Sequence, residues 1–365
     1  MYRIVFIVSL VIISAHTALG ISGSGTEAEP WRIESQADFN EFVAEPNYWD
    51  DWTRLETDIN LAGLTYTTAV IAPDIYKYGF DFDGTAFIGV FDGNDHKMIG
   101  LTIDDGGAGN DFLGLFGCIG EGGQVSSLGL EGGSVSGDDY VVGGFVGWNN
   151  RGSISNCYST GSVNGDWCVG GIVGGNDGDV SNCYSTVNVN GDEYVGGLVG
   201  INGGNVSSCY STGNVNGVED VGGLLGENYY GSIANCFWDT DTQTHGVTVS
   251  VGYDLGTVTN IAGLPTVQMQ TKSTFADSGW DFVDIWDLTC EGMNYPRFIR
   301  QITAADFLCP HGVDFRDYSF FAGYWRDTNC GDADDCNGTD FDLSGMVDIG
   351  DFDIFCGYWL SGAGH

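Results

Sequence analysis

The sequence predicts a mainly β protein, in which a right-handed parallel β-helix precedes a small α-helical domain. Three observations support this prediction. A unit of 26 or 27 residues recurs through the middle of the chain, glycine is unusually frequent (59 of 365 residues), and a different pattern occurs twice near the C-terminus. Glycine at this level, without a Gly-X-Y period, indicates many tight turns, as in all-β repeat proteins.

The charge of the chain limits its partners. There are 50 Asp and Glu residues against 11 Lys and Arg, which gives a formal net charge of −39. A polyanion of this kind repels nucleic acid and anionic membranes, so we expect neither as a partner. Hydrophobic residues make up 42% of the chain and aromatic residues 13%. This apolar content is compatible with a packed core despite the charge.

The first twenty residues predict a secretory signal peptide. Arg3 gives a short positive start, an apolar run of about a dozen residues follows, and Ala18 and Gly20 are small residues at the −3 and −1 positions of the expected cleavage site. The run is short for a membrane span, and no later segment is long and apolar enough for one. We therefore expect cleavage after Gly20 and a mature chain without a membrane span, secreted, extracellular or on the cell surface.

The repeats predict a solenoid. Four copies begin at Val142, Val169, Val195 and Val221, and a weaker copy begins at Leu113. Each copy holds three short β-type runs, which cannot bury a face alone. One copy has the length of one coil of a parallel solenoid, whose coils stack ~4.8 Å apart and whose hand follows from the crossover rule. Propeller blades need about 40 residues, and helical repeats conflict with so much glycine.

The composition also predicts how the chain is divided. We expect N-terminal strands capping the solenoid in residues 21–100 and the repeats in residues 101–261. A closing segment then occupies residues 262–302, and the helical domain occupies residues 303–365.

Stacking turns each repeat position into a column. An asparagine column can bond amide to amide along the axis, or its members can adopt the left-handed conformation at each turn. A cysteine column invites disulfides in an exported chain, but its identical placement in every coil favours a buried, reduced ladder. The columns are Asn149, Asn176, Asn202 and Asn228, and Cys157, Cys183, Cys209 and Cys236.

Two further columns have competing interpretations. Aromatic rings recur at one position, where they form either a structural ladder or a sugar-binding strip, and their regularity favours the ladder. Acids recur at another, where a solvated edge is favoured over a site for divalent cations. The aromatic column is Tyr158, Tyr184, Tyr210 and Phe237, and the acidic one is Asp139, Asp166 and Asp192, with Glu193, Glu219 and Asp220 nearby.

These repeats resemble a known family. The string V-G-G-[FIL]-[VL]-G-x-N, followed by N-C-Y-S-T-G-x-V-x-G, is similar to the GLUG motif of bacterial secreted and surface proteins. Weaker likeness continues upstream through residues 31–33 and 87–93 and downstream through residues 236–239 and 295–297. The resemblance covers roughly residues 30–300 and implies a β-helical surface module. The family is named for its motif and not for a reaction.

The C-terminal region contains a predicted calcium loop. Two segments, from Val313 and from Val347, match at an offset of 34 residues. The second overlaps a twelve-position loop with oxygen donors at positions 1, 3, 5, 9 and 12 and glycine at position 6, and apolar residues at helical spacing follow it. The predicted Ca²⁺ ligands are Asp340, Asp342, Ser344, the Met346 carbonyl, Asp348 through water, and Asp351.

A loop and helix of this kind, present twice, resemble a type I dockerin, which is EF-hand-like. Its first copy has Asp306, Asp314 and Asp317 at positions 1, 9 and 12 but lacks suitable residues between them, so we expect one calcium site. The resemblance implies a cohesin-like or cell-surface partner, although Ile349 and Gly350 replace the usual Ser/Thr at the docking positions. Nearby, Cys330 and Cys336 are placed to close a small disulfide loop.

The case for catalysis is poor. Parallel β-helices can carry lyases and hydrolases, but from residue 101 to 260 the only basic residue is Arg151 and the only histidine is His245. Proton transfer on acidic sugars needs more than this. We expect a non-catalytic protein for adhesion, surface display or polysaccharide binding, and not an enzyme. The alternative is a glycoside hydrolase or lyase on a β-helix, tethered through its dockerin.

Overall fold

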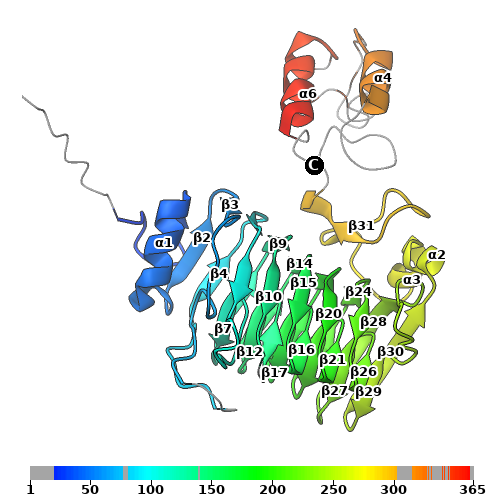
Figure 1. Cartoon of the computed structure of the whole chain (residues 1–365). Helices are drawn as coiled ribbons and strands as arrows, with labels where there is room; N and C mark the ends of the chain where they lie inside the picture. The colour runs from blue at the N-terminus through cyan, green and yellow to red at the C-terminus, as the bar shows by residue number, and fades with distance from the viewer. Residues whose placement is uncertain are drawn as a thin grey trace, which may run out of the picture.

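The computed structural model describes residues 20–76, 81–138, 140–301, 315–326 and 346–361, with the single positions 328, 330, 339, 341 and 344. Residues 20–301 form a parallel β-solenoid with a short helix near its start and a closing segment at its end (Figure 1). Two further helices, α4 and α6, form a separate pair. Residues 1–19 of the expected signal peptide lie outside the described residues.

The solenoid consists of about nine coils. Within the described residues, nine parallel strands follow one another along the first face, each paired with the next. They are β1 (Trp31–Ile33), β2 (Trp52–Leu55), β4 (Val90–Asp92), β8 (Gln124–Ser126), β13 (Ser153–Ser155), β18 (Asp179–Ser181), β23 (Asn205–Ser207), β28 (Ser232–Asp239) and β30 (Thr257–Leu264).

Four other faces complete the coils, all with parallel pairing. The second holds β3 (Ile59–Asn60), β5 (Lys97–Ile99), β9 (Gly129–Glu131), β14 (Tyr158–Ser159), β19 (Tyr184–Ser185) and β24 (Tyr210–Ser211). The third holds β6 (Thr102–Asp104), β10 (Ser134–Ser136), β15 (Ser162–Asn164), β20 (Asn188–Asn190) and β25 (Val215–Asn216). The fourth holds β11 (Val142–Gly143), β16 (Trp167–Gly170), β21 (Glu193–Gly196) and β26 (Glu219–Gly222). The fifth holds β7 (Phe116–Ile119), β12 (Val146–Asn149), β17 (Val173–Asn176), β22 (Val199–Asn202), β27 (Leu225–Asn228) and β29 (Val251–Asp254).

A complete coil therefore has five short strands, and the predicted number of three is wrong. The coil from β13 to β17 shows the reason. Residues with positive φ, such as Asn156 (φ 53°), interrupt the chain and leave strands of two to four residues. Strands of two residues have no alternating pattern, so the sequence does not reveal them.

The Gly-Gly pair of each repeat allows the coils to approach closely. A Cβ atom at Gly171 would overlap the carbonyl oxygen of Gly197 in the next coil, and one at Gly197 would overlap the carbonyl oxygen of Gly223. A glycine at this position therefore keeps consecutive coils in register.

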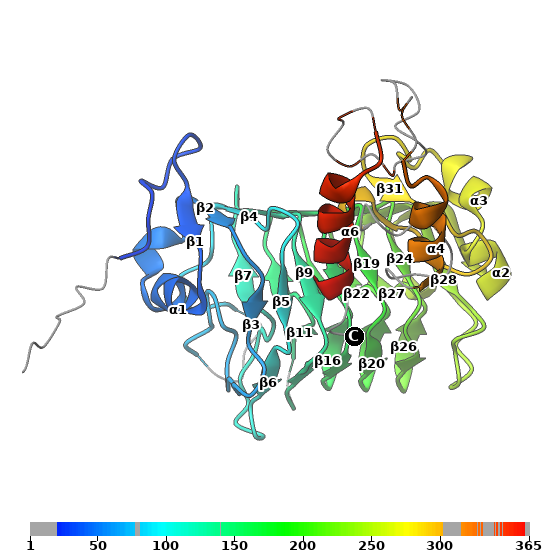
Figure 2. The ribbon, with the colours of Figure 1, turned by 90° about the horizontal axis from the view of Figure 1, so that it is seen from above.

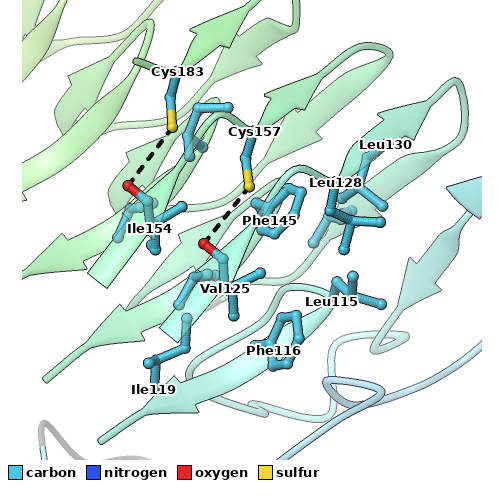
Figure 3. Packing of buried hydrophobic residues seen from close by; sticks show 14 of the residues in the cluster. Leu115, Phe116, Ile119, Val125, Leu128, Leu130, Phe145, Ile154, Cys157 and Cys183 are labelled. Carbon is cyan, nitrogen blue, oxygen red and sulfur yellow. Dashed lines mark hydrogen bonds between the residues drawn. The ribbon is translucent and has the colours of Figure 1, made fainter. Parts of the chain in front are cut away.

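The core lies inside the coils. Columns of aliphatic side chains point inward from every face, for example Val163, Val189 and Val215 on the third face, and all are buried. Figure 3 shows such packing around Phe116 and Phe145, whose rings stack 6.4 Å apart. Burial of this continuous column of apolar area is the main force that holds the coils together.

The N-terminal segment contains a helix that we did not predict. The strands of residues 21–100 continue the sheets of the repeats, and α1 (Gln36–Ala44) packs against them with Phe39 and Phe42 buried (Figure 1). Ser35 caps this helix, since its hydroxyl accepts a hydrogen bond from the Asp38 amide. The following 3-10 turn spans Pro46–Tyr48. This Ser-x-x-Asp box was the available sequence signal for the helix.

The closing segment folds back onto the second face. It contains α2 (Thr266–Met269), α3 (Lys272–Ala276), the antiparallel pair β31 (Trp286–Asp287) and β32 (Arg297–Phe298), and a 3-10 turn at Ile299–Gln301. Figure 2 shows these elements beside the last coils. Met269, Phe275 and Trp286 pack against the aromatic side chains of β14, β19 and β24.

The C-terminal helices α4 (Phe315–Gly323) and α6 (Ile349–Ser361) pack on each other. The Phe321 and Phe355 rings stack 5.0 Å apart, and these two residues occupy the same position in the segments repeated at an offset of 34. The Arg326 amide donates to the Val347 carbonyl at 2.9 Å. Across the part of the chain that the structure describes, none of the helices combines the length and apolar character that crossing a membrane requires.

Candidate functional site

The asparagine column forms a buried amide ladder, as one of the two interpretations predicted. Asn149 Nδ2 donates to Asn176 Oδ1 at 2.8 Å, Asn176 to Asn202 at 2.8 Å, and Asn202 to Asn228 at 2.9 Å. The left-handed residues of the repeats are at other positions, which include Asn156 and Asn182. The ladder satisfies polar side chains inside the core, which is a structural role.

The cysteine column is buried and unpaired, as predicted. The thiols of Cys157 and Cys183 donate to carbonyls of the preceding coils at 3.9 Å (Figure 3). These thiols pack as small apolar groups of the core. Away from the column, Cys290 and Cys330 each take part in a disulfide. Cys336, the expected partner of Cys330, lies outside the described residues.

The aromatic column is a covered ladder. The Tyr158 and Tyr184 rings stack 5.0 Å apart at 7°, and Tyr184 and Tyr210 stack 5.0 Å apart at 4°. The rings point out of the solenoid, but the closing segment buries them, and the Tyr210 hydroxyl donates to the Pro296 carbonyl. This cover favours the structural interpretation, because the rings have no face open for a sugar.

The acidic column lies at an exposed edge, as expected. The side chains of Asp166 and Asp192 are exposed, and the Asp192 amide donates to the Asp166 carbonyl at 2.9 Å. Partial burial, followed by the charges of Asp192 and Asp138, raises the pKa of the Asp166 carboxyl. Asp139 lies outside the described residues.

A second aromatic surface lies on the fourth and fifth faces of the same coils, where the repeats differ from one another. We call it the aromatic groove. It encloses about 350 Å³ and is open to solvent. Its walls come from the turns and strands around β12, β16, β17, β21, β22 and β27: Phe112, Val141, Trp148, Trp167, Cys168, Gly175, Tyr194, Ile201, Glu227 and Tyr229.

One column of the fifth face creates the hollow. The parallel register places Trp148, Gly175, Ile201 and Glu227 side by side in consecutive coils. A Cβ atom at Gly175 would meet Trp148 at 3.4 Å and Ile201 at 3.7 Å, which are ordinary contacts. Glycine is therefore not required by the backbone there. Its effect is to leave open space between larger neighbours.

The aromatic rings of the groove are held in place. The Trp148 indole nitrogen donates to Asp177 Oδ2 at 2.9 Å, and the Trp148 ring stacks on Phe112 with centroids 5.7 Å apart. The Trp167 ring lies edge-on to Tyr140 and to Tyr194, at 6.0 and 5.7 Å. Rings fixed in this way bind a flat apolar face without losing rotamer freedom.

Left-handed backbone conformations occur at three residues of the fourth face. Cys168, Tyr194 and Asp220 have positive φ (46°, 56° and 51°), and the strand register passes over them. Positive φ is unfavourable for residues as bulky as tyrosine, and three stacked coils retain it.

The groove has an acidic rim and floor. Glu227 is only 7% exposed, and burial, together with Asp220 and Glu193, raises the pKa of its carboxyl. A hydrogen bond to Glu193 and burial raise the pKa of Tyr194, and burial raises that of Cys168 to about 12. Both therefore stay neutral near neutral pH, and among the described residues that line the groove the only charge is that of Glu227.

Sequence reasoning missed the groove. Its residues share repeat positions but not residue types, so a comparison that looks for what repeats passes over them. The available signal was the difference in residue type between the copies at these positions. Aromatic residues at outward positions, such as Trp148, Trp167 and the exposed Tyr229, accompany it.

The predicted calcium loop is described in part. Asp351 is buried, and its Oδ2 accepts from the Asp348 amide at 2.8 Å. Asp348 Oδ1 accepts from the Gly350 amide at 2.8 Å, so the two carboxylates form a capping box at the start of α6. Ser344 Oγ donates to the Met346 carbonyl at 3.1 Å. Asp340 and Asp342 lie outside the described residues, so the calcium site remains a prediction.

The first copy of the loop is described even less. Asp306 and Asp314 lie outside the described residues, and only the backbone of Asp317 is described, within α4. Between the two helices, Tyr318, Trp325, Ile349 and Phe352 line a second hollow of about 340 Å³. Ile349, at one of the positions expected to dock a partner, is 69% exposed.

The repeats match a known family model. The model of the GLUG motif matches residues 138–164, 165–190 and 191–216, which are three consecutive coils. The fold and these matches define a parallel β-solenoid with GLUG repeats.

One relative and one solved structure are similar to this chain. Halomucin of Haloquadratum walsbyi (strain DSM 16790 / HBSQ001) is 32% identical over 161 residues, which cover 42% of this chain. The match spans only 2% of halomucin. A crystal structure described as a "putative immunoglobulin A1 protease" from Bacteroides ovatus has a TM-score of 0.54 at 20% identity and covers 76% of this chain and 94% of that chain. At this identity the likeness shows the fold alone.

Proposed function

We propose that this chain is an exported, non-catalytic surface protein that binds polysaccharide in the aromatic groove. The groove is the observation that supports the proposal: an open hollow at Gly175 between oriented rings, on a rigid scaffold. Pyranose rings present apolar C–H faces to such rings and hydroxyl groups to surrounding carboxylates. The GLUG match and the similarity to halomucin support export and a surface location.

Binding of a glycan panel tests this proposal. The mature chain, residues 21–365, is titrated calorimetrically with neutral, amino and acidic oligosaccharides. Trp167→Ala is expected to weaken the best ligand by at least about tenfold, because it removes one wall of the groove. Tyr76→Ala, a change of an exposed ring outside the groove, is the matched control and should bind normally. If Trp167→Ala binds as the parent does, the groove is not the site.

The non-catalytic part of the proposal has its own test. Each oligosaccharide that binds is incubated with the protein, and its chain length is followed with time. We expect no shortening. Depolymerisation that Glu227→Gln abolishes would instead establish the alternative, in which the raised pKa of Glu227 serves a general acid.

We further propose that the C-terminal pair binds one Ca²⁺ and docks a cohesin-like or cell-surface partner. The described donors of the loop are all oxygen atoms, which suit Ca²⁺, and Asp348 and Asp351 already tie the loop to α6. The hollow at Tyr318, Trp325 and Ile349 is the surface on which a partner would pack. When bound, the ion would neutralise acids in a segment with few cations.

Calcium titration of the mature chain tests the ion. A stoichiometry of one is expected, with a stabilisation of the helical pair by about 2.7 kcal/mol at a hundred times Kd. Asp340→Ala should abolish calcium binding and leave the capping box intact, whereas Asp351→Ala should abolish calcium binding and also disrupt the capping box. A stoichiometry of two would show that the first loop is also a site, and no binding at millimolar Ca²⁺ would refute the site.

A further inference from the structure

The buried carboxylate of Glu227 is the feature of the groove that polysaccharide binding in general does not explain. Glu227 lies on β27, is more than nine-tenths buried and lines the groove. Among the described residues, no hydrogen bond or ion pair reaches its carboxylate. A largely buried carboxylate without a partner is less well solvated than a free one, so a ligand that brings a positive charge would bind more tightly than a neutral one.

Among the described residues that line the groove, none is Lys, Arg or His. Between residues 101 and 260 the only Lys or Arg is Arg151, which is exposed and lies 3.8 Å from Glu121. Glu193 and Asp220 add negative charge beside Glu227. Within the described residues the groove has no counter-charge, so a ligand that carries one would supply it.

A metal ion and an organic ammonium group are the two kinds of cation to compare, and the geometry of the groove distinguishes between them. Among the residues that the structure describes, no three acids, cysteines or histidines are close enough together to hold a metal ion. The groove instead combines one buried carboxylate with the ring surfaces of Trp148, Trp167 and Tyr194. Aromatic rings and carboxylates together are the surroundings that an organic ammonium group prefers.

We propose, on the basis of the polysaccharide-binding function above, that the groove selects sugars with a free amine, that is, 2-amino-2-deoxyhexose units of a polysaccharide. The ammonium group binds the Glu227 carboxylate, and the pyranose ring packs on the aromatic walls. An N-acetylated sugar leaves Glu227 without a counter-charge. An acidic sugar is repelled by Glu227, Glu193 and Asp220.

This proposal implies a pH optimum. Binding requires Glu227 to be ionised and the sugar amine to be protonated. Affinity therefore falls on the acid side as Glu227 takes up a proton, and on the alkaline side as the amine loses one. The titratable groups around Glu227 come from every neighbouring strand: Cys168 of β16, Glu193 and Tyr194 of β21, Asp220 of β26 and Tyr253 of β29. Cys168 and Tyr194 stay neutral across this range, so the carboxylates dominate the acid limb.

Calorimetry with two oligosaccharides of equal length tests the proposal. The mature chain is titrated with tetra-glucosamine and with tetra-N-acetylglucosamine, from pH 5 to pH 8 at low salt. We expect the glucosamine tetramer to bind at least about tenfold tighter at its optimum. Glu227→Gln should reduce this preference to less than about twofold, chiefly by weakening the binding of the glucosamine tetramer. Glu121→Gln, which removes the same charge at an exposed turn, is the control and should keep the preference.

A second variant tests the location without removing a charge. Gly175→Leu fills the hollow, and the contacts available to a Cβ there are ordinary, so the fold should persist. It is expected to lower the affinity for both tetramers at least about tenfold. Circular dichroism confirms the fold of each variant. If Gly175→Leu binds both tetramers normally, the groove is not the site.

The remaining outcomes separate this inference from the function on which it rests. Equal binding of both tetramers, unaffected by Glu227→Gln, would overturn the amine selectivity and leave polysaccharide binding standing. A preference that Glu121→Gln reduces as much as Glu227→Gln would show a general attraction of the polyanion for cations and would also overturn it. No binding of either tetramer or of any glycan in the panel would overturn both.

Discussion

The tyrosine ladder and the aromatic groove are two aromatic surfaces on different faces of the same coils. In the ladder, Tyr158, Tyr184 and Tyr210 recur at one repeat position, and their rings stack 5.0 Å apart. The closing segment covers them. In the groove, Trp148 and Trp167 have no counterparts of the same type in the next coil, and nothing in the described structure covers them. Regular repetition accompanies burial here, and irregularity accompanies an open surface.

The contrast between the ladder and the groove predicts different effects on stability for two substitutions that replace an aromatic side chain by alanine. Tyr210→Ala removes a ring that is 2% exposed, and it should lower the free energy of unfolding by about 3 to 5 kcal/mol. Trp167→Ala removes a partly exposed ring and should change stability by less than about 1 kcal/mol while weakening glycan binding. Urea denaturation of the two variants measures both values. Equal losses of stability would remove the distinction between the surfaces.

A smaller contrast lies within one coil, between a repeated and a surface asparagine. Asn202→Ala breaks the ladder bonds to Asn176 and Asn228 and leaves buried amide groups unpaired, so it should destabilise the protein by about 2 to 3 kcal/mol. Asn205→Ala, three residues further on, removes only an exposed hydrogen bond to Asp179 and should cost less than about 0.5 kcal/mol. The same denaturation experiment compares them, and a loss at Asn205 as large as at Asn202 would contradict the structural role of the ladder.

The smallest expected effect is a difference in pH dependence. The folded protein raises the pKa of Glu227 above its ordinary value of 4.5, so ionising it disfavours the folded state. Stability contributed by its protonated form is present below pH 4.5 and is lost as pH rises through the folded pKa. Glu227→Gln should therefore be more stable than the parent at pH 7, with the difference vanishing towards pH 4.5. Denaturation at several pH values measures it, and a constant difference would contradict the shift.

The ladder tyrosines respond at the other end of the pH scale. Burial raises the pKa of Tyr158, Tyr184 and Tyr210, so these phenols stay neutral in the folded state when the unfolded chain ionises near pH 10. Their contribution to stability is complete below pH 10 and falls above it. Tyr184→Phe should reduce this alkaline loss, because phenylalanine does not titrate. An unchanged alkaline transition would show that the ladder does not control it.

Periodicity made much of the fold predictable from the sequence. The period gave the coils, and repeated residue types gave the inward positions of Asn149 and Cys157 and the stacking of Tyr158. The five strands per coil were not predictable, since two-residue strands leave no pattern. Helix α1 was missed although Ser35 and Asp38 mark its start.

The candidate site was not predictable in the same way. Trp148, Gly175, Ile201 and Glu227 become neighbours only when the coils stack in register, and no single copy of the repeat contains more than one of them. The left-handed conformations of Tyr194 and Asp220 beside Glu227 are also not revealed by the sequence. Columns in which the copies disagree are the places to search in other solenoids.

The amide ladder has a direction, and both of its ends are closed. Every amide donates towards the C-terminal end, where Asn228 Nδ2 meets the Asp254 carboxylate at 2.9 Å. At the other end Asn149 Oδ1 accepts from the Gly152 amide at 3.0 Å. Each interior coil adds one donor and one acceptor that match those of its neighbours. Inserting or removing a whole coil therefore leaves the amide-to-amide bonds of the ladder complete, and the ladder permits the solenoid to change its length in whole-coil steps.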